Sequence, residues 1–122
     1  MQSSKVLGFG AVFAFLGVAA GAFGAHALRD HLSAESMAIY QTGVQYQLVH
    51  ALALVALGCQ DRIRVSTIAW FFGIGIVVFT GSLFALAISG QTWWGAVTPI
   101  GGLSFLAGWA TLAATAFKKP VA

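Results

Sequence analysis

The chain has 122 residues, of which 59% are hydrophobic and only 7% carry a charge. Soluble domains contain about 25% charged residues, so this composition indicates a protein whose surface does not all face water, and it excludes an intrinsically disordered chain. The single cysteine, Cys59, excludes a disulfide scaffold. The net charge of +3 is scattered along the chain, unlike the clustered basic face that binds nucleic acid.

Four apolar segments are long enough to cross a bilayer, which requires about 20 mostly apolar residues. They lie at about residues 6–24, 38–59, 67–88 and 99–117 and leave little chain for a soluble domain. We therefore predict one all-α integral membrane domain, a four-helix transmembrane bundle. The first segment also resembles a signal peptide, but its apolar stretch of about 18 residues exceeds the usual 7–15, so we expect a true span.

The basic residues predict the orientation of the spans, because lysine and arginine are enriched in cytoplasmic loops. With four spans, five of the six basic residues fall on one side: Lys5, Arg62, Arg64, Lys118 and Lys119. Arg29 alone falls on the other side. We therefore expect both termini to lie in the cytoplasm.

Small residues recur at helical spacing and predict close helix packing, as is typical of membrane helices. The expected packing positions are Gly17, Gly21, Gly81, Gly101, Ser104 and Gly108. These stripes suit packing within the chain, and one of them would also suit an oligomer interface. Two spans have predicted N-caps, Ser33 before the second span and Thr98 before the fourth, where Pro99 would occupy the first turn.

The second span is unusually polar. At 100° per residue, Tyr40, Gln47 and His50 fall within about 80° of one another, and Tyr46 flanks them. His50 lies near mid-membrane, where an ionisable side chain is by default a functional hypothesis. The alternative is that this stripe holds helices together by hydrogen bonds, with His50 paired to a hydroxyl of Thr80, Ser82 or Ser104.

From this stripe we predict a polar ligand-binding cleft that is open to the outer side. Its expected residues are His26, Tyr40, Tyr46, Gln47, His50 and Thr98. We predict no metal or other cofactor, because the sequence has no ligand set at a recognisable spacing. His26 and His50 would be offset by about 15 Å along straight helices, so they cannot bind the same metal ion. No catalytic arrangement of nucleophile and base is visible either.

Motifs in each of the four spans resemble a known family. They are Gly21–His26, Gln41–Gly43 with Tyr46–Gln47 and His50–Ala53, Gly81–Leu83, and Val97–Gly102 with Phe105–Trp109. In this order and spacing they resemble the small YgdD-type inner-membrane proteins, a bacterial family of unknown function with a similar small transmembrane protein in animals. The resemblance implies a four-span protein of the bacterial inner membrane and brings no established activity, substrate or cofactor.

These observations together favour a non-catalytic binding or accessory protein that contacts membrane lipids. A homo-oligomer or a membrane-protein partner is a further expectation, and nucleic acid is not expected. Two alternatives remain open at this point: a transporter of small solutes or ions acting as an oligomer, and a membrane enzyme with a redox or lipid-modifying activity.

Overall fold

The computed structural model describes residues 1–118, so Lys119, which entered the charge argument, lies outside the described residues. All regular structure in the described part is helical. The elements in chain order are α1 (Ser3–Phe23), the π-helical η1 (Gly24–Leu28), α2 (Ala34–Gly58), α3 (Ser66–Gly75), the π-helical η2 (Ile76–Thr80), α4 (Gly81–Ser89) and α5 (Trp94–Lys118).

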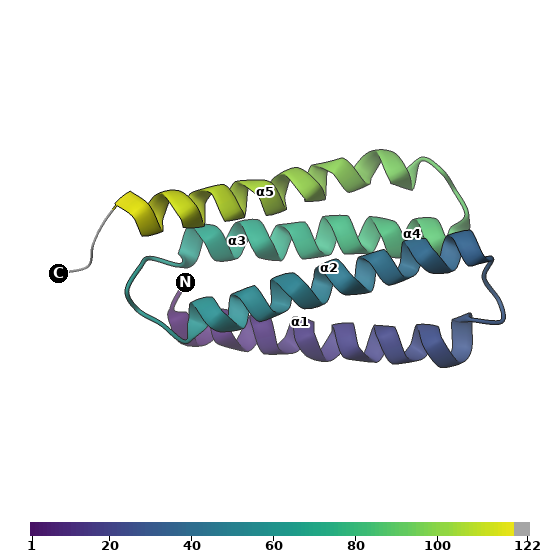
Figure 1. Ribbon diagram of the computed structural model, residues 1–122, viewed down its shortest axis with the longest axis horizontal. Coiled ribbons are helices and arrows are strands. Elements are labelled where there is room, and N and C mark those ends of the chain that lie inside the picture. Colours follow the sequence, from purple (N-terminus) through teal and green to yellow (C-terminus); the bar gives the residue numbers. More distant parts are fainter. Residues whose placement is uncertain (119–122) are drawn as a thin grey trace.

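These elements form long antiparallel rods that lie side by side (Figure 1). α1 continues into η1, and α3, η2 and α4 form one continuous rod. α1 packs mainly on α2, α2 packs on η2 and α4, and α3 packs on α5. α1 begins and α5 ends at the same end of the bundle, to which the connection between α2 and α3 also belongs (Figure 1). We call this end the basic end, because it carries Lys5, Arg62, Arg64 and Lys118.

Three of the rods are long and apolar enough to cross a membrane: Ser3–Leu28, Ser66–Ser89 and Trp94–Lys118. They correspond to the first, third and fourth predicted spans. α2 has 25 residues, as many as α5. Its glutamines and His50 lower its mean hydropathy, so it is not among these candidates. Composition and length therefore support three of the four predicted spans.

The outer surface of the bundle is strongly apolar. Phe15 on α1 is 73% exposed and Leu106 on α5 is 65% exposed, and large apolar side chains are exposed along both helices. Soluble monomers rarely expose large contiguous apolar patches. The bundle therefore has the surface of a protein that is surrounded by hydrocarbon, as the low charge content predicts.

The helix starts agree with the sequence prediction at α2 and differ at α5. Ser33 is the N-cap of α2, and its side chain accepts a hydrogen bond from the Ser36 backbone N–H at 3.1 Å. The prediction that Thr98 caps the fourth span is wrong, because α5 begins at Trp94 and contains Pro99 in its interior. Backbone hydrogen bonds between residues three apart, such as Gly95 N to Thr92 O at 3.0 Å, start the helix upstream of the proline.

Most of the predicted small residues lie where helices approach closely. A Cβ at Gly17 would lie 2.7 Å from Leu48, and one at Gly21 would lie 3.3 Å from Val44, both on α2. Gly101 of α5 lies against Phe79 of η2, and Gly108 of α5 lies against the ring of Phe72 of α3. Ser104 donates a hydrogen bond to the Phe71 carbonyl at 2.7 Å. Gly81 departs from the prediction, because a Cβ there would meet nothing within 4 Å.

Candidate functional site

The polar stripe of α2 faces the inside of the bundle. Tyr40 and His50 are each 3% exposed and Gln47 is 5% exposed. Gly43 lies between them on the same face and is also buried. The helical spacing read from the sequence therefore places these side chains together, on the side of α2 that packs against the other helices.

Tyr40 and Gln47 hold α2 to α1. The Tyr40 hydroxyl donates to the Ala20 carbonyl at 2.5 Å, and the Gln47 Nε2 donates to the Phe13 carbonyl at 2.9 Å. Both acceptors are backbone oxygens of α1, which have a second lone pair beyond the one used by the helix. The two side chains act as hydrogen-bonding links between helices, which was the alternative to a ligand site.

His50 links α2 to α5. The Trp109 indole N–H donates to His50 Nε2 at 3.0 Å, and His50 Nδ1 lies 2.7 Å from the Tyr46 carbonyl oxygen. An indole can only donate, so Nε2 is the acceptor and the proton of the neutral ring sits on Nδ1, which donates to Tyr46. Both ring nitrogens are engaged, and neither is presented to a ligand.

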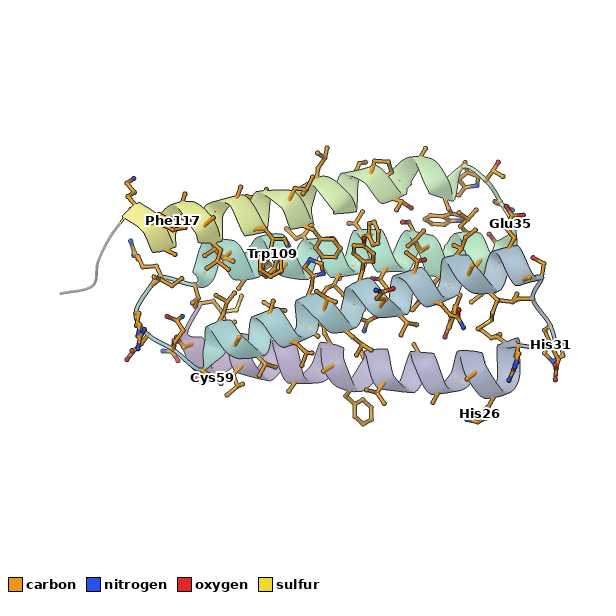
Figure 2. The ribbon with its side chains drawn as sticks, in the orientation of Figure 1. His26, His31, Glu35, Cys59, Trp109 and Phe117 are labelled. Atoms are coloured by element: carbon orange, nitrogen blue, oxygen red, sulfur yellow. The ribbon has the colours of Figure 1, made fainter. Side chains whose placement is uncertain are left out.

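An aromatic cluster surrounds this hydrogen bond. The Phe105 ring stacks on His50 with centroids 3.6 Å apart and planes 11° apart, and Phe72 meets the same imidazole edge-on at 5.3 Å. Figure 2 shows Trp109 reaching from α5 into the bundle. The sequence analysis did not assign Trp109 to this site. The signal was its indole N–H: Trp109 is 40% exposed, but it lies within a predicted span, where a polar N–H that faces no water needs a protein acceptor.

The hydroxyls that the sequence offered as partners of His50 have other roles. Thr80 Oγ1 donates to the Gly43 carbonyl at 3.2 Å, and Ser82 Oγ lies 2.6 Å from Thr98 Oγ1. Ser104, as described above, bonds the backbone of α3. The alternative that paired His50 with one of these hydroxyls is therefore wrong in its partner, and the indole of Trp109 takes that position.

The remaining predicted site residues are not drawn into one cleft. His26 lies exposed on η1, far along the bundle axis from Trp109 (Figure 2). Tyr46 is 42% exposed, and its ring lies tilted against that of Phe79 with centroids 4.9 Å apart. Thr98 bonds Ser82 rather than the α2 stripe. Within residues 1–118, no three histidine, cysteine or acidic side chains are grouped to hold a metal ion.

An apolar groove lies elsewhere on the bundle, beside α1 and the α3–η2 rod. Its volume is about 400 Å³, within the range of about 300–1,000 Å³ that is typical of ligand pockets. Its lining residues are Met1, Val6, Phe9, Phe13, Leu54, Ala69, Trp70, Gly73, Ile74, Val77 and Val78. All of these are apolar, so the groove suits a hydrocarbon chain and offers nothing to a polar solute.

A second, more open hollow of about 650 Å³ adjoins the groove at the basic end. The two share Met1, Phe9 and Trp70, and the hollow adds the polar side chains of Gln2 and Lys5. We call it the basic hollow. The sequence analysis missed both cavities, because their walls come mainly from two segments about 60 residues apart that are mostly apolar and carry no motif.

Comparison with known proteins identifies the family. Residues 20–102 match the family described as "Protein of unknown function (DUF423)". The chain is 43% identical over 124 residues to the UPF0382 inner membrane protein YgdD of Escherichia coli (strain K12), covering 97% of this chain and 93% of the relative. It is 41% identical over 112 residues to a UPF0382 membrane protein of Staphylococcus haemolyticus, covering 89% and 92%. No solved structure matches. The resemblance seen in the four motifs is confirmed, and the chain belongs to the DUF423 family of UPF0382 membrane proteins.

Proposed function

We propose that the protein is a non-catalytic binding protein of the bacterial inner membrane, whose apolar groove holds the hydrocarbon chain of a membrane molecule. The observation that carries the proposal is the groove itself, a volume of about 400 Å³ with an entirely apolar lining. It is built from α1, the α3–η2 rod and Leu54 of α2. α1 and the rod expose large apolar side chains to the surroundings of the bundle. A hydrocarbon chain would enter such a groove from the bilayer without passing through water.

The proposal includes four spans, with α2 as the second. Its 25 residues give a length of about 37 Å, enough for a hydrocarbon core of about 30 Å. α2 packs along the rod formed by α1 and η1. Gly10 of α1 lies against Val55 of α2, and Gly24 of η1 lies against Tyr40 of α2. The buried polar groups that lower its hydropathy bond partners inside the bundle, so they need not face lipid.

Both termini are proposed to be cytoplasmic. The basic end holds the start of α1, the α2–α3 connection and the end of α5 (Figure 1), and it carries most of the lysines and arginines. Such an excess marks the cytoplasmic side. The relative YgdD is named as an inner membrane protein, which supports the inner membrane as the location.

A non-catalytic role is supported by how the reactive groups of α2 are used. The Tyr40 hydroxyl, the Gln47 amide and both nitrogens of His50 are bonded to protein partners. A general base must be within hydrogen-bond reach of the proton it removes. To act as a base, His50 would first have to break its hydrogen bond with Trp109. These groups therefore serve to hold the helices in place beside the groove.

The topology can be tested with the native cysteine, which is exposed at the end of α2. A membrane-impermeant maleimide applied to intact spheroplasts is expected to leave Cys59 unlabelled until the membrane is permeabilised. A variant that combines Cys59→Ser with His31→Cys is expected to be labelled without permeabilisation. If both cysteines react from the same side, α2 does not cross the membrane.

Gly73→Leu tests the groove. Gly73 lines the groove, and a Cβ at this position meets nothing within 4 Å, so a leucine can occupy the space without displacing the backbone. We expect the fraction of purified protein that carries a bound lipid, measured by native mass spectrometry, to fall about tenfold, which corresponds to about 1.4 kcal/mol of binding free energy.

Gly81→Leu is the matched control. Gly81 lies on the same rod, also has nothing within 4 Å of its Cβ, and does not line the groove. This variant is expected to retain lipid like the wild type. Equal lipid retention by the Gly73 and Gly81 variants would contradict the groove as the binding site, since the two substitutions add the same apolar side chain.

A further inference from the structure

We infer that the molecule held in the groove is an anionic phospholipid, with its phosphate in the basic hollow beside Lys5. This inference rests on the proposed function and adds the chemistry of the headgroup. The groove and the basic hollow share Met1, Phe9 and Trp70. The apolar groove opens into the basic hollow, which is lined by the ammonium group of Lys5. This arrangement matches a molecule in which a hydrocarbon chain is joined to an anion.

The charges of the bundle favour an anion at this end. Arg62, Arg64 and Lys118 also lie at the basic end, where Asp61 is the one acidic residue among those described. The other two acids, Asp30 and Glu35, lie at the opposite end. Basic residues at the membrane surface attract anionic lipids, and the attraction falls off within a Debye length. A phosphate beside Lys5 would therefore meet a field that is positive overall.

The depth of the two cavities also fits a phospholipid. Trp70 is 57% exposed and lines both cavities, and tryptophan is enriched at the boundary between hydrocarbon and headgroups. From Trp70 the groove follows the rod to Val78, a distance of about 12 Å along the helix axis. One acyl chain would follow this path toward the middle of the bilayer, while the phosphate stays at the level of Lys5.

The test measures which lipid the protein keeps. Wild-type protein is reconstituted with equal amounts of phosphatidylglycerol and phosphatidylcholine of identical acyl chains, extracted in mild detergent and analysed by native mass spectrometry. We expect phosphatidylglycerol to be retained over phosphatidylcholine by about fivefold. In Lys5→Gln the ratio is expected to fall from about fivefold toward one, because the charge nearest the phosphate is lost. Lipid is still expected to be retained, because the groove is unchanged.

Lys118→Gln is the matched control, because it removes the same charge at the same end but does not line the basic hollow. It is expected to lower the ratio much less than Lys5→Gln does, because its charge acts only through the long-range field. Equal retention of the two lipids by the wild type, or an unchanged preference in Lys5→Gln, would overturn the headgroup assignment alone, provided that Gly73→Leu still lowers total bound lipid. If the wild type retains neither lipid, the proposed binding function itself fails.

Discussion

Gly101→Ala is expected to lower the stability of the bundle by about 1–3 kcal/mol, the usual range for an overpacked interior. A Cβ at this position would overlap the backbone nitrogen of Phe79 and lie 2.7 Å from its Cα. Backbone atoms cannot rotate aside as a side chain can, so α5 must move away from η2. The movement would also loosen Phe105, which lies one turn further along α5 and stacks on His50.

The neighbouring glycine supplies the control for this prediction. A Cβ at Gly102 would lie 3.8 Å from the ring of Phe79, an ordinary van der Waals contact, so Gly102→Ala is expected to leave stability nearly unchanged. The free energy of unfolding in mixed detergent micelles measures both variants. Equal stability of the two variants would show that α5 and η2 are further apart than the structure has them.

Breaking the hydrogen bond between Trp109 and His50 is expected to destabilise the protein while leaving it inserted. Trp109→Phe removes the donor and leaves His50 Nε2 buried without a partner, and His50→Leu leaves the indole N–H without its acceptor. Hydrogen bonds between membrane helices contribute about 0.6 kcal/mol on average and up to about 1.7 kcal/mol. This bond joins α2 to α5, whose backbones do not pack directly against each other, so we expect a value in the upper half of that range.

A double-mutant cycle separates the bond from the loss of ring packing. The two single variants and the combined variant are unfolded under the same conditions, and the coupling free energy is expected to be about 1.2–1.7 kcal/mol. The Phe105 and Phe72 contacts of His50 affect the single variants but largely cancel in the coupling. A coupling of zero, with His50→Leu as stable as the wild type, would restore the ligand-binding interpretation of His50.

The polar stripe of α2 shows which features of the site the sequence could predict and which it could not. Helical spacing placed Tyr40, Gln47 and His50 on one face because spacing depends only on the geometry of a single helix. Whether that face opens on a cleft or packs on neighbours depends on the other helices. In the structure, Tyr40 and Gln47 donate hydrogen bonds to backbone carbonyls of α1, and His50 accepts one from the indole of Trp109. No local pattern names partners that are 20 to 59 residues away.

The amino-acid sequence by itself determined that the protein lies in a membrane and where three of its apolar spans lie. It also determined the cap at Ser33 and the end of the bundle at which the positive charges gather. Each of these follows from local composition, because burial in lipid and helix capping act on a few neighbouring residues at a time. Only the tertiary structure decided the start of α5 at Trp94, the lack of packing at Gly81, the partner of His50, and the groove that joins the basic hollow. These features depend on how closely helices approach one another, and that distance is set by contacts between residues far apart in the chain.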